Sequence, residues 1–129
     1  MTNLELQTLA EHRVAAVWAK FRAYYGTRLN QSIPTIILNS RLRTTGGRSF
    51  YWNRIIDLST ELFAEHTSEF IINTIPHEVC HQVAWDIYQD RGHGPNWKHT
   101  MRVFGIEPNR YHNMINSIWA AEKAKQKWG

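Results

Sequence analysis

The pentapeptide His77-Glu78-Val79-Cys80-His81 holds the residues of this 129-residue chain that are best suited to chemistry. On a helix, side chains four residues apart lie on one face, so His77 and His81 can direct their imidazoles at a single point. Two neutral imidazoles at this spacing are typical of a zinc site, and a carboxylate directly after the first histidine can act on a zinc-bound water. The pattern therefore predicts one catalytic Zn²⁺ ion, with Glu78 as the general base.

A catalytic zinc ion takes three protein ligands and leaves a fourth position open for water. His93 is the favoured third ligand, because Gly92 and Gly94 on either side free the backbone to turn its ring toward the helix. Four other side chains remain alternatives: His99, His112, Glu107 and Glu122. A short metzincin arrangement is excluded, because Ala84 and Ile87 stand where that class has glycine and histidine.

Hydrophobic periodicity predicts the elements that must position these residues. A helix is expected at the N-terminus, followed by three strands joined by short turns, which favour an antiparallel meander. A long helix containing the histidine pair follows, with a kink or a fresh start at Pro76, and two further helices complete the chain. The predicted ranges are 4–25 for the first helix, 35–39, 48–52 and 54–58 for the strands, and 68–90, 95–104 and 109–127 for the later helices.

Several apolar residues are expected in the core of an α+β fold. Cys80 is interpreted as a small core residue, since it lies about 100° round the helix from His81. The tryptophans on apolar helix faces are also predicted to be buried, and the last helix should turn four residues inward. The tryptophans are Trp18, Trp85, Trp97 and Trp119. The four inward residues of the last helix are Met114, Ile115, Ile118 and Trp119.

Length and composition indicate a single domain over residues 1–129. No apolar run approaches the roughly 20 residues that span a bilayer, and the first residues do not resemble a signal peptide. A lone cysteine excludes an internal disulfide, which fits a reducing compartment. We therefore expect a cytoplasmic protein with no membrane association.

Charge is distributed unevenly along the chain, with a net value of +4. Residues 12–56 contain eight Lys or Arg and no acid, whereas residues 57–90 contain seven acids and no Lys or Arg. The basic stretch, above all Arg41, Arg43, Arg48 and Arg54, could bind DNA non-specifically, or the acidic block could neutralise it across the fold.

Aromatic residues beside the basic stretch suggest how unpaired DNA could be held. Tyr51 or Trp52 could stack on bases of single-stranded or disrupted duplex DNA, although core packing is the favoured role of each. His112 could donate to a transition-state oxyanion, but a surface or capping role is favoured.

The histidine motifs resemble those of the SprT-like zinc metallopeptidases, a family that includes bacterial SprT and the eukaryotic Spartan proteases. The resemblance covers about residues 35–114 and is strongest in two segments, Ile75-Pro76-His77-Glu78-Val79-Cys80-His81 with Trp85, and Gly92-His93-Gly94-Pro95-Asn96-Trp97-Lys98 with Met101. It implies that His77, His81 and His93 bind zinc, that Glu78 is the catalytic acid/base, and that the fold is a zincin-like α+β domain.

The resemblance also implies protease activity, and for Spartan it implies DNA-stimulated cleavage of proteins crosslinked to DNA. Many members continue into a cysteine-rich zinc ribbon, which residues 1–129 do not contain. We therefore expect a zinc metalloendopeptidase that cleaves protein or peptide substrates associated with DNA, with a role in DNA repair. The alternatives are a zinc-stabilised module that binds DNA or protein without proteolysis, and a hydrolase of non-peptide amides.

Overall fold

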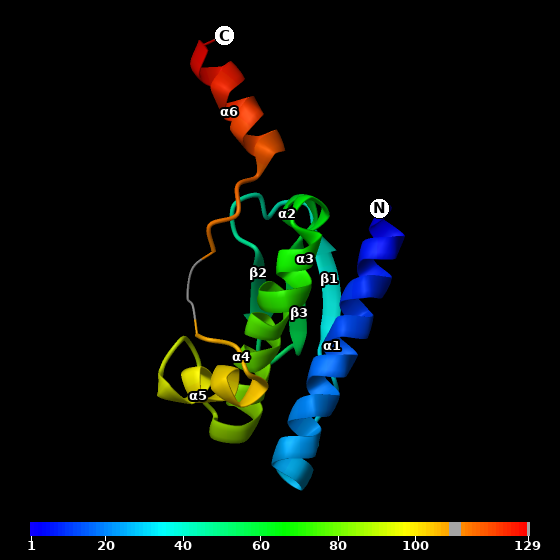
Figure 1. Cartoon of the computed structure of the whole chain (residues 1–129), viewed down its shortest axis with the longest axis vertical. Coiled ribbons are helices and arrows are strands. Elements are labelled where there is room, and N and C mark those ends of the chain that lie inside the picture. The colour runs from blue at the N-terminus through cyan, green and yellow to red at the C-terminus, as the bar shows by residue number, and fades with distance from the viewer. Residues whose placement is uncertain (109–111, 129) are drawn as a thin grey trace.

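A three-stranded sheet lies at the centre of the fold, and helices cover one of its faces (Figure 1). The computed structural model describes residues 1–108 and 112–128. The strands are β1 (Thr35–Asn39), β2 (Gly47–Phe50) and β3 (Ile55–Ser59), in the spatial order β1-β3-β2. Because β1 runs parallel to β3 and only β2 runs antiparallel to it, the sheet is mixed and the predicted antiparallel meander is wrong.

Side-chain polarity explains why β3 takes the central position. Ile56 and Leu58 are fully buried between the sheet and the helices. The edge strand β2 has only glycine and polar residues at positions 47–49, and such a strand tolerates one unpaired edge better than an apolar one. The buried apolar strand β3 therefore lies between β1 and β2. Turn signals in the sequence do not reveal this strand order.

Two helices supply most of the core. Helix α1 (Asn3–Tyr25) begins at a capping box in which Thr2 and Glu5 exchange hydrogen bonds, and it packs along β1. Helix α4 (Ile75–Tyr88) packs against α1 and β2 (Figure 1). Its buried side chains include Val79, Cys80 and Val83, so the interpretation of Cys80 as a core residue agrees with the structure. Burial also raises the pKa of the Cys80 thiol.

The segment before α4 is divided more finely than the sequence predicts. Ser59 caps a short helix, α2 (Thr60–Glu65), which the sequence analysis did not include. Helix α3 (Thr67–Glu69) then leads into η2 (Phe70–Thr74), a π-helical turn, and α4 starts with Pro76 in its first turn. Glu69, Thr74 and Ile75 keep right-handed helical dihedral angles, and the Ile75 N–H bonds to the Phe70 carbonyl, so the helical path does not restart at Pro76. The π-helical turn before Pro76 accommodates the missing N–H of proline.

The last part of the chain departs furthest from prediction. A short 3-10 turn, η1 (Gly26–Arg28), follows α1 at the other end of the chain. Helix α5 (Pro95–Phe104) has the predicted bounds. Helix α6 (Ser117–Trp128) begins later than the predicted start at residue 109, which lies outside the described residues, and projects away from the sheet (Figure 1). Ile115 and Ile118 are 67% and 54% exposed, so their predicted inward orientation is wrong. Met114 and Trp119 are half-buried.

None of the helices within the described ranges combines the length and the apolar character that crossing a bilayer requires.

Candidate metal centre

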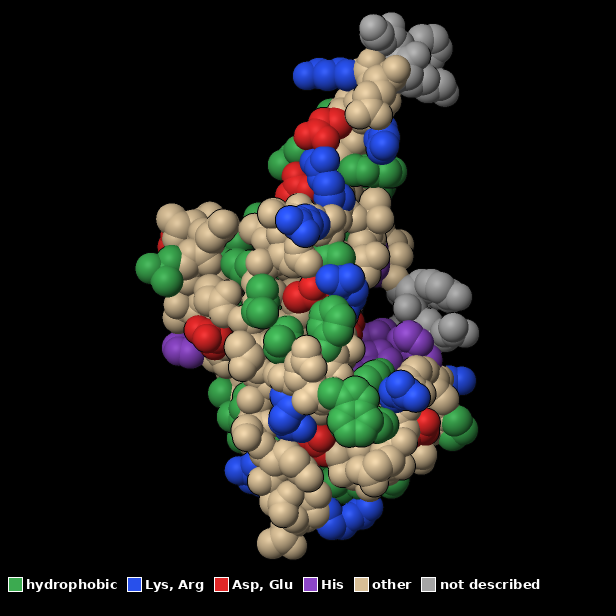
Figure 2. Space-filling view, turned by 180° about the vertical axis from the view of Figure 1, so that it is seen from behind, with side chains coloured by type: hydrophobic (Ala, Val, Ile, Leu, Met, Phe, Trp, Pro, Cys, Tyr) green, Lys and Arg blue, Asp and Glu red, His purple; other side chains and the backbone are tan. Residues whose placement is uncertain are grey.

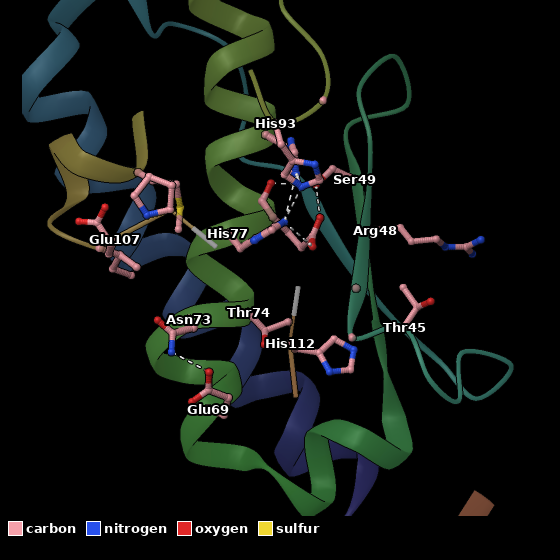
Figure 3. Close-up of a pocket in the computed structure, with 18 of the residues that line it drawn as sticks. Thr45, Arg48, Ser49, Glu69, Asn73, Thr74, His77, His93, Glu107 and His112 are labelled. Carbon is pink, nitrogen blue, oxygen red and sulfur yellow. Dashed lines mark hydrogen bonds and ion pairs between the residues drawn. The ribbon is translucent and has the colours of Figure 1, made fainter. Parts of the chain in front are cut away.

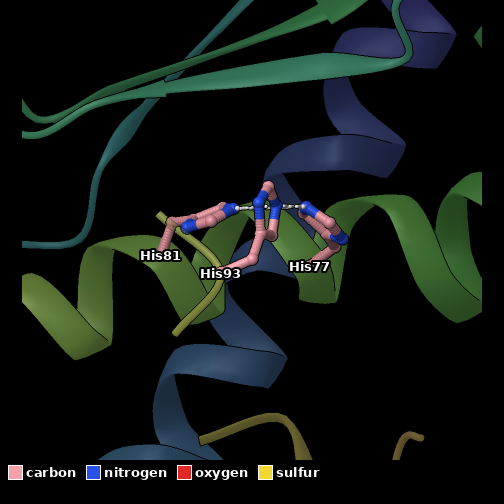
Figure 4. A group of neighbouring side chains, drawn as sticks. All are labelled: His77, His81 and His93. Atoms are coloured by element: carbon pink, nitrogen blue, oxygen red, sulfur yellow. Dashed lines mark hydrogen bonds between the residues drawn. The ribbon is translucent and has the colours of Figure 1, made fainter. Parts of the chain in front are cut away.

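Three histidine side chains converge beside α4 (Figure 4). The Nε2 atoms of His77, His81 and His93 lie 3.1 to 3.2 Å from one another. Nitrogens bound tetrahedrally to zinc at about 2.0–2.1 Å are separated by roughly 3.3 Å. In the part of the chain that the structure describes, this is the one group of three or more His, Cys, Asp or Glu residues close enough to hold a metal ion. The donor set and its spacing therefore fit zinc.

The backbone after α4 returns His93 to the helix. Gln89 adopts a left-handed conformation (φ 53°) that ends α4, and Gly92 has a φ of 85°, which favours glycine. Asn96 then donates a 2.9 Å hydrogen bond to the Asp90 carboxylate and closes the loop. Gly94 has an ordinary negative φ, so of the two glycines proposed to free the backbone only Gly92 uses a conformation that favours glycine.

Trp97 on α5 forms the apolar side of the site. Its ring is buried and stacks on the His81 imidazole at a centroid distance of 5.3 Å. Burial, together with the neighbouring His77 and His93, holds the pKa of His81 well below its ordinary value. The imidazole is therefore neutral at physiological pH, which is the form that binds a metal.

Glu78 lies beside the three nitrogens and is only 6% exposed. Burial raises its pKa to about 7, and the hydrogen bond from Ser49 acts in the opposite direction. The Ser49 hydroxyl lies 3.0 Å from Oε1 of Glu78 and 2.8 Å from its backbone oxygen, whereas Oε2 lies 3.7 Å from Nε2 of His77. A carboxylate with a pKa near neutrality, next to a metal site, is suited to accept and return a proton.

A cavity of about 960 Å³ opens onto this group (Figure 3). Strand β2 forms one wall and the η2 turn another, while Glu107, Pro108 and His112 also line the cavity. Figure 2 shows histidine side chains gathered at one surface of the molecule, next to a group of hydrophobic side chains. The cavity is large enough for a stretch of polypeptide several residues long.

The other candidate ligands lie outside the histidine group. His99 is exposed on α5, Glu107 is 3.9 Å from Arg102, and Glu122 forms an ion pair with Arg43. In His112, Nε2 bonds to the Thr44 carbonyl and Nδ1 accepts the Met114 N–H, so both ring nitrogens are engaged. This arrangement leaves His112 no donor for an oxyanion and supports the structural role that the sequence analysis favoured.

Most of the predicted DNA-contacting arginines are ion-paired with the acidic block of residues 57–90. Arg43 pairs with Glu61 and with Glu122 of α6, Arg48 pairs with Asp57, and Arg54 pairs with Asp86. Arg41 is exposed, and its backbone N–H donates to Asn39. On the face shown in Figure 2, Lys and Arg side chains are scattered among acidic ones.

Tyr51 and Trp52 lie in the turn after β2 and not in a strand. Tyr51 is half-buried, lines the cavity and packs against Trp85, and burial raises its pKa. Trp52 is 78% exposed and meets the half-buried Trp85 edge to face, so the favoured core role of Trp52 is wrong. Trp18 and Trp97 are buried as predicted.

The sequence did not predict a role in the site for Ser49, Gly47 or Trp97. Ser49 falls within the predicted strand 48–52, and Trp97 belongs both to the predicted core and to the family motif. Contacts between β2 and α4 join residues about 30 positions apart, and nothing in the local pattern indicates them. The signal available for Trp97 was its position four residues after His93, on the helix that this loop begins.

The fold and site define an α+β protein with a histidine triad suited to a metal ion. The sequence model of the SprT-like family matches residues 14–114, and the chain belongs to this family. The predicted family is thus confirmed.

The curated relatives are named Protein SprT. The protein from Vibrio parahaemolyticus is 38% identical over 82 residues, which cover 62% of this chain and 49% of the relative. The protein from Pseudomonas putida is 29% identical over 106 residues, covering 80% of this chain and 63% of the relative. The chain thus spans about half to two thirds of the length of these relatives. No solved structure matches significantly.

Proposed function

We propose that this protein is a zinc-dependent metalloendopeptidase in which His77, His81 and His93 hold the metal and Glu78 is the general base. The observation that carries the proposal is the convergence of three Nε2 atoms within 3.2 Å of one another, beside the Glu78 carboxylate, which is only 6% exposed. A purely structural metal site has no need of such a base, so Glu78 favours an enzyme over a zinc-stabilised binding module.

A zinc ion in this site would supply Lewis acidity, which acidifies water and polarises a carbonyl group. The residues of the chain have their own roles. His77, His81 and His93 would orient the metal, and Trp97 would exclude water from one side of His81. Glu78 would take the proton from the attacking water and pass it to the leaving amine, a role that its buried position beside the three histidine nitrogens supports. Among the described residues, β2 has one edge that pairs with no strand. This strand borders the cavity and could pair with an extended substrate backbone.

Metal analysis combined with protease assays tests the proposal. Wild-type protein should bind one zinc ion and cleave protein substrates, and Glu78→Gln should keep the zinc while losing about 10²- to 10⁴-fold in kcat. Zinc binding with no proteolysis in either protein, with and without DNA, would favour the binding module. Cleavage of small amides but not of peptides would favour a non-peptide amide hydrolase.

DNA-associated or DNA-crosslinked proteins are the substrates we propose, with a role in DNA repair and a cytoplasmic location. The support is the family relationship, the net charge of +4 and the exposed Arg41. The ion pairs of Arg43, Arg48 and Arg54 reduce the positive field that these side chains present. The binding we expect is therefore weak, non-specific and sensitive to salt, with single-stranded or disrupted duplex DNA stacking on Trp52.

A further inference from the structure

The two carboxylate oxygens of Glu78 have different surroundings. Oε1 lies 3.0 Å from the hydroxyl of Ser49, and Oε2 lies 3.7 Å from Nε2 of His77. One oxygen is therefore held by the sheet, and the other is directed toward the point where the three histidine nitrogens meet. Figure 3 shows Ser49 directed from β2 toward this group, whereas Arg48 points away from it.

The hydroxyl of Ser49 is itself fixed by a second contact. It lies 2.8 Å from the backbone oxygen of Glu78, so both acceptors belong to the same residue. Ser49 pairs with the buried Ile56 of β3, which sets the height of the hydroxyl above the sheet. A single side chain from a regular strand thus holds the main chain and the side chain of Glu78 in one relative orientation.

Gly47, two residues earlier on the same face of β2, allows this close approach. A Cβ atom at position 47 would lie 3.1 Å from Cγ of Glu78 and 3.0 Å from the backbone oxygen of Asp57, which is closer than most Cβ contacts in proteins, so these neighbours would have to shift. The Glu78 side chain therefore lies against bare backbone at position 47 and under the hydroxyl at position 49.

From these contacts we infer that Ser49 is a positioning residue, which holds Oε1 of Glu78 so that Oε2 faces the metal position. This inference rests on the proposed function for its kinetic consequence, whereas the orientation of the carboxylate is a structural claim independent of catalysis. Misplacing a reacting group by about 1 Å can lower a rate by roughly 10²-fold, so a single hydrogen bond that fixes a carboxylate can have a large effect.

Crystal structures of the zinc-loaded wild type, Ser49→Ala and Ser49→Thr test the orientation directly. Wild type and Ser49→Thr, which keeps a hydroxyl, should show Glu78 in one conformation with Oε1 on that hydroxyl. In Ser49→Ala the carboxylate should rotate or occupy more than one conformation. An unchanged Glu78 conformation in Ser49→Ala would overturn the inference.

Kinetics separate positioning from a merely structural role. We expect kcat of Ser49→Ala to fall about 10- to 100-fold while KM changes about twofold or less, with zinc content unchanged and most of the rate restored in Ser49→Thr. Ser68→Ala removes an exposed hydroxyl from α3 and is the matched control, which should keep the wild-type rate. Equal kcat in Ser49→Ala and wild type would refute the role of Ser49. If the wild type lacks peptidase activity, the proposed function fails, and the crystallographic comparison still decides the inference.

Discussion

Glu78 and Asp57 are two buried carboxylates on opposite faces of the same small sheet, and their surroundings drive them to opposite chemical states. Glu78 is 6% exposed and Asp57 is 4% exposed. Glu78 is enclosed between the sheet and α4, and burial raises its pKa to about 7. The hydrogen bond from Ser49 lowers this pKa and the charge of Asp57 raises it, but both act less strongly than burial. For Asp57, burial also acts upward, but hydrogen bonds from Arg48 and Asn39 outweigh it and lower the pKa.

This difference shows that solvent exposure alone does not determine the role of a carboxylate. A cation makes Asp57 a permanent charge that ties β2 to β3. Within residues 1–108 and 112–128 no Lys or Arg pairs with Glu78, so its carboxylate can exchange a proton near neutral pH. The same strand serves both residues, since Arg48 and Ser49 point to opposite faces.

The largest expected effect comes from removing the histidines that define the Glu78 side of the comparison. His77→Ala, His81→Ala and His93→Ala should each lose most of the bound zinc, because three nitrogens are needed to complete the site. His99→Ala and His112→Ala serve as controls and should retain it. Metal stoichiometry of the purified variants is the measurement, and full occupancy in His93→Ala would require another third ligand.

The stability of the metal-free protein sharpens the comparison through its pH dependence. The pKa of Glu78 is raised from 4.5 to about 7 on folding, so the folded state keeps a proton that the unfolded state has lost between these values. The free energy of unfolding of the wild type, relative to that of Glu78→Gln, should therefore fall by about 3 kcal/mol as pH rises through this window. Above about pH 7 this difference should stay level. Urea unfolding of both proteins from pH 4 to pH 8 measures it. Parallel stability curves would show that the buried carboxylate is not destabilising.

How far the sequence predicts this molecule can be judged from particular residues. The period of Leu6, Val14 and Phe21 predicts α1, and the spacing of His77, His81 and His93 predicts the metal group, because both depend on helix geometry or on a short loop. The parallel pairing of β1 with β3 was not predictable from turns. It depends on the central position of β3, the strand that carries the buried Ile56 and Leu58. The Ser49 contact with Glu78 depends in turn on that sheet order.

The smallest expected effect concerns the basic residues of β2 and of the loop between β1 and β2. Arg43 and Arg48 are engaged with carboxylates, so Arg41 is the arginine of the predicted set best able to contact phosphate. Arg41→Glu should weaken non-specific single-stranded DNA binding a few-fold and lower the salt slope by about one. Fluorescence anisotropy at several salt concentrations measures this, with Arg102→Glu as a control of equal charge change. Equal weakening in both variants would point to net charge alone.

The pKa values of Glu78 and Asp57, measured by carboxyl ¹³C NMR titration of the metal-free protein, test the central claim most directly. The account predicts that Glu78 titrates with a midpoint near 7, whereas Asp57 titrates below its ordinary 3.8. Ser49→Ala should leave Asp57 unchanged, because the two side chains lie on opposite faces of the sheet. A Glu78 midpoint at or below 4.5 would contradict the account, since the carboxylate would then be a fixed charge like Asp57 despite its burial.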